Sequence, residues 1–237
     1  MERTDRLWPD GPVFYFDDTL FAPGTDSFLL SYFTRTKRFE RVCDLGAGTG
    51  LLGILLLSRQ RELEVHNVEI QPHALALAEK TFAANGMTAQ NYLADLRQLE
   101  GVLPAGSFDL VISNPPYFKT GAGLKAATDA RQTAREENCC TMDDLCRAAA
   151  RLLRWGGRFS VVHKPDRLTD LLCAMRAHGM EPKRLRMVQN TAAAAPSLVL
   201  VEGKRGGKSG LVIEPPLILK HPDGSESEEY RAAYFRR

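Results

Sequence analysis

The segment Asn114-Pro-Pro-Tyr117 carries the residue types that can act on an amino nitrogen. Pro115 and Pro116 lack a backbone N–H and stiffen the chain, which leaves carbonyl oxygens free to accept hydrogen bonds. The side-chain oxygen of Asn114 and the carbonyl of Pro115 can together accept both hydrogens of a planar NH₂ group. Those bonds draw the nitrogen lone pair out of conjugation, and the ring of Tyr117 offers a face on which a flat base or amide can stack. The segment predicts chemistry at an exocyclic nitrogen, although the prolines alone could simply end a strand.

A glycine-rich loop, Asp44-Leu-Gly46-Ala47-Gly48-Thr-Gly50, lies upstream between a predicted strand and a predicted helix. Glycines here permit a tight turn and a close approach of the backbone to a ligand, with N–H groups facing it. The run Gly48-Thr-Gly50-Leu-Leu-Gly53 also satisfies the G-x-G-x-x-G pattern of nicotinamide dinucleotide sites, which is a weak signal alone. Asp44 disfavours that reading, because a carboxylate is unfavourable beside a pyrophosphate and suits a cationic cofactor.

Two further acids fall at the ends of the next predicted strands. Glu69 comes twenty-three residues after Gly46, and Asp95 follows the run 91–94. A carboxylate at the first of these places can accept the hydroxyls of a ribose, and one at the second can accept the amino group of an adenine. We therefore expect Asp44, Glu69 and Asp95 to line a nucleotide site at the carboxyl edge of a parallel sheet. The alternative is that the acids are solvated strand ends.

Strand-like and helix-like segments alternate from Arg41 onward, which is typical of an α/β fold. The expected strands are 41–45, 63–70, 91–94, 108–113, 158–163, 182–189 and 197–202. The expected helices are 51–58, 72–85, 141–154 and 166–179, with a capping box at Thr141, an N-cap at Asp166 and a stop at Gly156-Gly157. Only seven residues separate the last two strands, so they should pair antiparallel. The pattern predicts a mostly parallel seven-stranded sheet with a reversed terminal strand.

We expect a single domain over residues 1–237. Residues 1–38 should form a hairpin within 12–22, turning at Asp17-Asp18, and a helix over 27–33 capped by Asp26. Residues 39–203 should form the core. The segment 204–237 is rich in glycine and charge, and we expect an extended C-terminal appendage.

Together, Asp44 to Gly50, Glu69, Asp95 and Asn114 to Tyr117 resemble the motifs of S-adenosylmethionine-dependent methyltransferases that modify amino nitrogens. Over nearly its whole length the chain also resembles one subgroup, the valine-tRNA (adenine-N6)-methyltransferases. That likeness extends to Gly24-Thr-Asp26, Ala134-Arg135-Glu136, Gly206-Gly-Lys208 and Pro215-Pro-Leu217.

The resemblance implies a Rossmann-like class I methyltransferase fold that binds S-adenosyl-L-methionine. It places Glu69 on the ribose and Asp95 on the cofactor adenine, and it places Asn114 and Tyr117 on the target nitrogen. The implied cofactor contacts are Gly24, Thr25, Asp26, Asp44, Gly46, Ala47, Gly48, Gly50, Glu69, Ile70, Asp95, Leu96 and Asn114. The implied catalytic residues are Asn114, Pro115, Pro116 and Tyr117.

The leading functional hypothesis is methylation of adenine N6 in structured RNA, for which we expect tRNA. A protein glutamine N5-methyltransferase acting on release factors is the nearest alternative, because an amide NH₂ presents the same two hydrogens. Such enzymes usually carry a helical N-terminal domain, for which the residues before Arg41 are too few. A DNA adenine methyltransferase, a non-catalytic RNA-binding module and a nicotinamide oxidoreductase are weaker alternatives.

Basic residues at two places are candidate RNA contacts. Arg131 and Arg135 follow the catalytic segment, and Lys183, Arg184 and Arg186 lie in the stretch 183–208, whose only acid is Glu202. Such a strip could hold RNA phosphates. The alternative for each is a solvated surface.

Composition narrows the class of protein further. The 237 residues include 31 Lys and Arg and 29 Asp and Glu, which gives a net charge of +2. A charge this small does not indicate that the molecule as a whole attracts nucleic acid. No run approaches about 18 apolar residues, which predicts no membrane span. The five cysteines form no CxxC pair and the N-terminus carries no secretory segment, which favours a reduced, cytoplasmic protein. The five histidines form no HxH or HxxxH pair, and we expect no metal.

Overall fold

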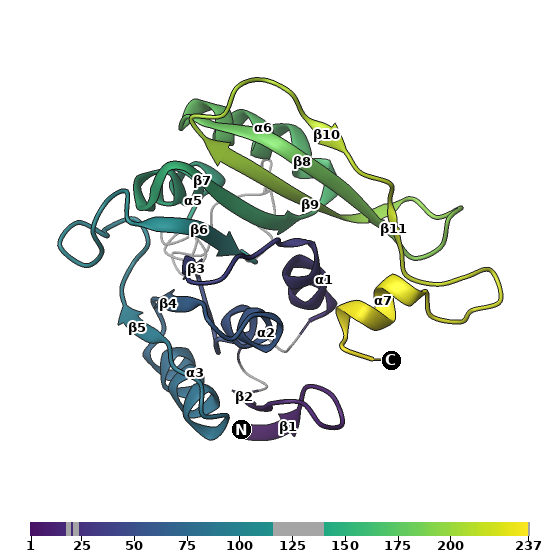
Figure 1. Cartoon of the computed structure of the whole chain (residues 1–237), viewed down its shortest axis with the longest axis horizontal. Helices are drawn as coiled ribbons and strands as arrows, with labels where there is room; N and C mark the ends of the chain where they lie inside the picture. Colours follow the sequence, from purple (N-terminus) through teal and green to yellow (C-terminus); the bar gives the residue numbers. More distant parts are fainter. Residues whose placement is uncertain (18–19, 21–23, 116–139, 237) are drawn as a thin grey trace, which may run out of the picture.

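The computed structural model describes residues 1–17, 20, 24–115 and 140–236. Its centre is a sheet whose described strands number nine, in the order β10-β8-β9-β7-β6-β3-β4-β5, with β11 also pairing with β8 (Figure 1). The seven longer strands are β3 (Arg41–Leu45), β4 (Glu64–Glu69), β5 (Gln90–Leu93), β6 (Phe108–Ser113), β7 (Leu153–His163), β8 (Met180–Gln189) and β9 (Pro196–Arg205). The two short ones are β10 (Val212–Ile213) and β11 (Leu217–Ile218).

Strand direction follows the sequence expectation. The described strands of this sheet run parallel to their neighbours except β9, which is antiparallel to both β7 and β8. The strand order reverses at β3, because β4 lies on one side of it and β6 on the other. Open α/β sheets bind ligands at such a switch point, outside the carboxyl ends of the strands.

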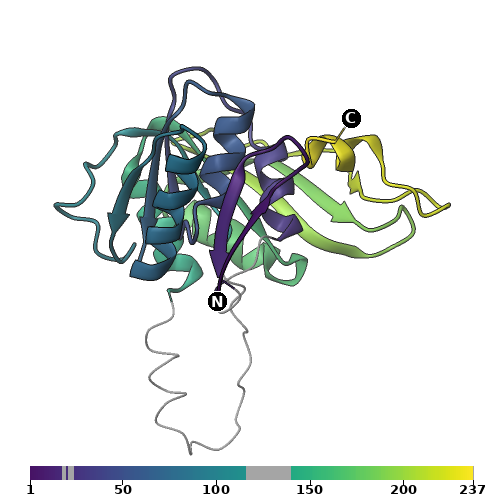
Figure 2. The same cartoon turned by 90° about the horizontal axis from the view of Figure 1, so that it is seen from below.

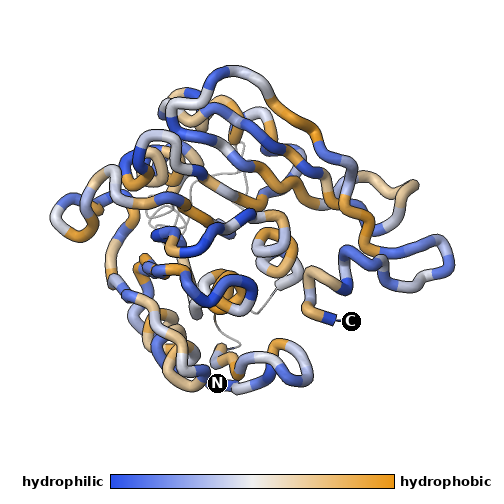
Figure 3. The backbone as a smooth tube through the Cα atoms, viewed as in Figure 1, coloured by the Kyte–Doolittle hydropathy of each residue, from blue (hydrophilic) through white to orange (hydrophobic). Residues whose placement is uncertain are grey.

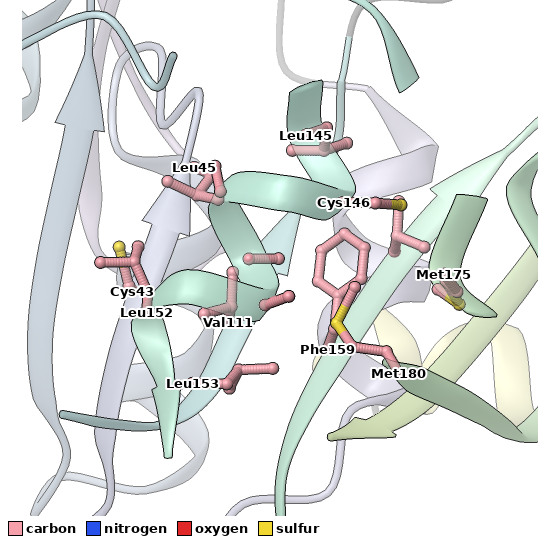
Figure 4. Close-up of a cluster of buried hydrophobic side chains, with 14 of the residues drawn as sticks. Cys43, Leu45, Val111, Leu145, Cys146, Leu152, Leu153, Phe159, Met175 and Met180 are labelled. Carbon is pink, nitrogen blue, oxygen red and sulfur yellow. The ribbon is translucent and has the colours of Figure 1, made fainter. Parts of the chain in front are cut away.

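Helices cover both faces of the sheet (Figure 1). On one face lie α1 (Thr25–Phe33), α2 (Leu51–Arg59) and α3 (Pro72–Ala84), joined by α7 (Glu228–Ala233). On the other lie α5 (Met142–Leu152) and α6 (Leu168–Ala177), preceded by the 3₁₀ turn η1 (Pro165–Arg167). In this second layer Cys146, Phe159, Met175 and Met180 pack together, fully buried (Figure 4).

Capping residues explain where some of these helices begin and end. The α5 helix begins with the expected capping box, in which Thr141 and Asp144 each accept the other's backbone N–H. It ends at Leu152, earlier than expected, because the chain passes directly into β7. Gly156 and Gly157 therefore do not stop a helix; they lie where the β6–β7 register shifts. Asp166 does not cap α6 and instead lies within η1, because the N-cap position is Arg167, without a side-chain hydrogen bond.

The described N-terminal hairpin lies ahead of the expected one. β1 (Glu2–Arg6) pairs antiparallel with β2 (Val13–Asp17), and the chain reverses at Trp8–Gly11, whereas Asp18 and most of the chain after the expected turn lie outside the described residues. Proline at the second position and glycine at the fourth suit such a turn. All five residues of β1 are exposed, so no hydrophobic alternation marks it as a strand. Asp26 is likewise not a cap, because Gly24 holds the N-cap position of α1.

The C-terminal segment is not an extended appendage. β10 and β11 pair with β8, and α7 packs beside α1, with Ala233 fully buried. The ring of Tyr234 stacks on Phe28 at 4.2 Å between centroids. Figure 2 shows the yellow C-terminal end lying against the earliest helices. The link between β11 and α7 is hydrophilic, whereas hydrophobic stretches follow the packed strands and helices (Figure 3). The single-domain boundary over residues 1–237 stays a prediction.

None of the described helices is long and apolar enough to cross a membrane.

Candidate active site

Strand register brings the predicted site residues to one edge of the sheet. Asp44 lies level with Asn67 on β4 and with Ile112 on β6. Continuing that register places Gly46 beside both Glu69 and Asn114, at the carboxyl ends of three adjacent strands. The hydroxyl of Ser113 donates to the carbonyl of Leu45 at 2.7 Å and ties β6 to β3 just before the site. The topological switch point and the sequence motifs therefore coincide.

The glycine loop leaves open space above its backbone. Gly46 and Gly48 have φ of +74° and +55°, and a Cβ built on either would meet nothing within 4 Å. Gly50 differs, because a Cβ there would lie 2.9 Å from the ring of Phe82 and 3.0 Å from Ala78. The first two glycines shape a cradle that a ligand can fill, and the third allows α2 to pack against α3.

We expected the loop N–H groups to face a ligand, but most of them are hydrogen-bonded to the protein itself. Gly46 and Ala47 both donate to the carbonyl of Val68, and Gly50 donates to Ala47. The Gly48 N–H donates to Glu69 Oε2 at 2.8 Å. Four of the loop's N–H groups are therefore already used, three of them by β4 residues, and a pyrophosphate would find few free donors. This arrangement counts against the dinucleotide alternative.

Asp44 is the most perturbed acid at this edge. Its side chain is 1% exposed, and neither carboxyl oxygen has a hydrogen-bond partner among the described residues. Burial, and then the negative charge of Glu69, raise the pKa of Asp44 to about 8. A buried carboxyl without a partner, close to a glycine loop, is expected where a cationic or hydrogen-bond-donating ligand completes the site.

Glu69 braces the loop. Its Oε1 accepts the N–H groups of Ile70 at 3.0 Å and Gln71 at 2.9 Å, in addition to the Gly48 bond on the other oxygen. A carboxylate has about four acceptor sites, so one remains for a ligand hydroxyl. Next to it, the side chain of Ile70 is 56% exposed, which is unusual for isoleucine and suits contact with a flat apolar ligand face.

Asp95 lies two residues beyond β5 and pairs with Arg97, whose Nη2 donates to Asp95 Oδ2 at 2.6 Å. Those hydrogen bonds from Arg97 lower the pKa of Asp95, so the carboxylate stays ionised. Leu96 is partly buried against the hydrophobic core. The structure thus places Asp95 and Leu96 at the expected edge, where Arg97 already occupies the Asp95 carboxylate.

The catalytic segment begins where β6 ends. The Nδ2 of Asn114 donates to the hydroxyl of Ser27 at 3.0 Å, whereas its shielded Oδ1 has no partner within the described chain. Pro115 is buried. Pro116 and Tyr117 lie outside the described residues. Ser27 was not among the site residues that we expected from the sequence. The one sequence feature that could have indicated it is its position directly after Gly24-Thr-Asp26.

The start of α1 approaches the same edge through this contact. Gly24 is the N-cap, Thr25 accepts a hydrogen bond from the Tyr234 hydroxyl at 2.8 Å, and Asp26 lies in the first turn. A helix N-terminus favours a negatively charged group, such as an amino-acid carboxylate. The position suits the methionine end of the expected cofactor.

The candidate RNA contacts fare differently. Arg184 is paired with Glu214 and Glu202, and Arg186 makes a bidentate pair with Glu229. Acids of the C-terminal segment and of β9 thus neutralise both arginines, which argues against phosphate binding by them. The ammonium of Lys183 donates to the carbonyl of Lys208 at 3.0 Å. Arg131 and Arg135 lie outside the described residues.

No group of three or more His, Cys, Asp or Glu residues within the described ranges is arranged to hold a metal ion.

The family model described as Methyltransferase small domain matches residues 16–168. The chain belongs to this methyltransferase family. The protein is therefore a methyltransferase.

Curated relatives of this methyltransferase carry one name in common. The tRNA1(Val) (adenine(37)-N6)-methyltransferase of Tolumonas auensis is 32% identical, over 88% of this chain and 86% of that protein. The protein of the same name in Escherichia coli O157:H7 is 31% identical, over 91% and 87%.

Solved structures support the fold of the methyltransferase. A predicted O-methyltransferase of Agrobacterium tumefaciens superposes with a TM-score of 0.73 at 22% identity, over 89% of this chain and 95% of that one. The 16S rRNA N2 G1207 methyltransferase of Thermus thermophilus, in complex with AdoMet and guanosine, superposes with a TM-score of 0.62 at 20% identity. The match covers 86% of this chain and 50% of that one. These confirm the expected Rossmann-like class I methyltransferase fold.

The described residues of the methyltransferase fit S-adenosylmethionine. The open space over Gly46 and Gly48 leaves room for a ligand close to the backbone, and the Asp44 carboxyl, which has no partner in the described part of the chain, suits a donor or a positive charge. The acceptor site left on Glu69 is at the strand end where a ribose is expected.

Proposed function

We propose that this methyltransferase transfers a methyl group from S-adenosyl-L-methionine to the exocyclic N6 of an adenine in tRNA, in the cytoplasm. The cofactor supplies an activated methyl group on a sulfonium. The observation that carries the proposal is Oδ1 of Asn114 at the end of β6, beside the glycine cradle, which is buried and has no hydrogen-bond partner among the described residues.

The residues divide the work as follows. Asp44, Glu69 and the glycine loop hold the cofactor. Asp95, Ile70 and Leu96 lie toward its adenine. Asn114 Oδ1 and the Pro115 carbonyl accept the two hydrogens of the target NH₂, and Tyr117 stacks on the base. These contacts would free the nitrogen lone pair to accept the methyl group that the cofactor supplies, with the S–C bonding electrons left on sulfur. The extra proton on nitrogen leaves afterwards to solvent, so no strong base is required.

The names of the curated relatives support adenine in tRNA over the glutamine alternative. We place the RNA phosphates on basic side chains other than Arg184 and Arg186, which are held in internal ion pairs.

The test is direct. The full chain is incubated with labelled S-adenosylmethionine and, separately, with tRNA lacking the modification, ribosomal RNA, DNA and release factors. We expect label in tRNA, recovered as N6-methyladenosine after digestion. Label in a release factor and none in RNA would overturn the proposal.

A further inference from the structure

The side-chain amide of Asn114 has two ends of nearly equal size and opposite chemistry. The oxygen accepts hydrogen bonds, and the NH₂ group donates them. A target amino group presents two donors, so only the orientation with Oδ1 toward the substrate gives an attractive contact. The orientation with Nδ2 outward would set donors against donors. Shape alone barely distinguishes the two, so the hydrogen bonds at both ends of the amide have to select one.

Ser27 supplies the hydrogen bond at the inner end. Its hydroxyl can donate or accept, but with a donor-bearing target at the outer end only the arrangement in which it accepts from Nδ2 is attractive at both ends. Its hydroxyl oxygen accepts from Asn114 Nδ2 at 3.0 Å, and the two residues lie 87 positions apart in the sequence. Ser27 is only 4% exposed, so water does not replace this contact readily. The opposite end of the amide, Oδ1, is shielded and has no partner in the described part of the chain. We infer that Ser27 is a positioning residue that turns the Asn114 amide so that its oxygen faces the target nitrogen.

The helix that carries Ser27 is itself fixed on both sides of that residue. The Tyr234 hydroxyl donates to Thr25 at 2.8 Å, and the Tyr234 ring stacks on Phe28 with an interplanar angle of 4°. Thr25 and Phe28 flank Ser27 in the first turn of α1. The C-terminal segment therefore holds the acceptor in place, and misplacing a catalytic group by about 1 Å can cost up to about 10²-fold in rate.

The first test is Ser27→Ala in the full-length protein. We expect turnover, kcat, to fall about tenfold, because the loss of one neutral hydrogen bond of about 1–1.5 kcal/mol corresponds to roughly that factor. The KM values for cofactor and substrate should change less than twofold, since Ser27 holds the amide and contacts neither compound in this scheme. A purely structural role would instead lower the thermal midpoint and change KM and kcat together.

A matched pair isolates the hydroxyl. Ser27→Thr and Ser27→Val place side chains of nearly the same shape at the site, and only Thr keeps the oxygen. We expect kcat near wild type in the Thr variant and a loss like that of Ala in the Val variant. Equal kcat in the two variants would overturn the inference, even where the Ala variant folds poorly.

Ser31→Ala is the control on the same helix. Ser31 is also a fully buried hydroxyl, one turn further on, but it accepts from Arg59 Nε at 3.1 Å instead of from Asn114. This variant should keep the wild-type kcat. A fall as large as that of Ser27→Ala would mean that any loosening of α1 slows the reaction.

The inference rests on the proposed role of Asn114, which is the same for an adenine and for a glutamine amide. The wild-type protein is first given RNA and release factors, and the variants are compared on the substrate that it methylates. Failure of the tRNA proposal appears in the wild-type substrate choice, whereas failure of the inference appears in the ratio of variant to wild-type kcat.

Discussion

Glu69 illustrates how one side chain serves both loop and ligand at the residue scale. Its oxygens accept three backbone N–H groups, including that of Gly48 in the cradle. Glu69→Ala should weaken S-adenosylmethionine binding by roughly 1.5–3 kcal/mol, the range for a hydrogen bond to a charged group. Calorimetry measures the affinity. Glu64→Ala, a partly exposed acid on the same strand, should leave it unchanged, and an unaltered affinity in Glu69→Ala would remove that residue from the site.

The raised pKa of Asp44 predicts a pH dependence of cofactor binding. Below its pKa of about 8 the ligand-free protein keeps this carboxyl protonated, chiefly because of burial. A positively charged cofactor favours the ionised form, so binding should release a proton. Affinity should therefore increase with pH toward 8, by at most about tenfold per unit. Titrations in buffers of different ionisation heats detect the proton, and Asp44→Asn should abolish its release.

Rising pH, which should strengthen cofactor binding through Asp44, should instead reduce the contribution of Asp44 to the stability of the ligand-free protein. The unfolded chain loses this proton near pH 3.8, whereas the folded chain keeps it up to about pH 8. Between those values the folded state binds more protons, so this contribution is present below pH 3.8 and declines as pH rises through the interval. Asp44→Asn should thus flatten the fall in thermal midpoint between pH 5 and pH 8. An unchanged slope would place the folded pKa of Asp44 near its ordinary value.

At the scale of elements, the glycine loop separates binding from packing. Gly48 and Gly50 both have positive φ, so alanine strains either position by about 1 kcal/mol. A Cβ at Gly50 also meets Phe82 and Ala78, so Gly50→Ala should lower stability by about 2–4 kcal/mol in total. Gly48→Ala should cost only the strain, but its methyl group projects into the cradle and should weaken cofactor binding. Thermal unfolding and calorimetry on both variants test this, and equal stability losses would contradict it.

At the scale of the whole molecule, the C-terminal segment adds two short strands beside β8 and packs α7 against α1. Arg184 and Arg186 on β8 hold Glu214 and Glu229 of that segment. Arg186→Ala should lower the unfolding free energy by about 1–3 kcal/mol, less than for a fully buried pair because Glu229 is partly exposed. Filter binding at several salt concentrations should give the wild-type slope, since the side chain is already neutralised.

Lys204→Ala is the comparison for that experiment. Lys204 is exposed and has no ion-pair partner among the described residues, so it is free to meet phosphate. If it does so, its removal should flatten the salt slope by up to roughly 0.7–0.9 and leave stability unchanged. A flatter slope in Arg186→Ala instead would return that arginine to the RNA contacts.

The sequence alone determined the alternation of strands and helices, the reversed β9, the cap of α5 and the edge at which Asp44, Glu69 and Asn114 meet. Each of these follows from neighbouring residues, because hydrophobic periodicity, capping and turn chemistry act within a few positions. The carboxyl ends of parallel strands share an edge in any such sheet, so motif order along the chain predicts which edge carries the candidate site before any contact is known.

Only the tertiary structure decided which distant groups complete that site. β1 has no buried face, and β10 and β11 are two residues long, so local pattern carried no signal for their pairing. Arg184 looks like a surface cation in the sequence until Glu202 and Glu214 are brought to it. Ser27 is one ordinary helix serine until folding places its hydroxyl against Asn114. Such contacts depend on the combined packing energy of segments far apart in the chain, which periodicity over a few residues does not encode.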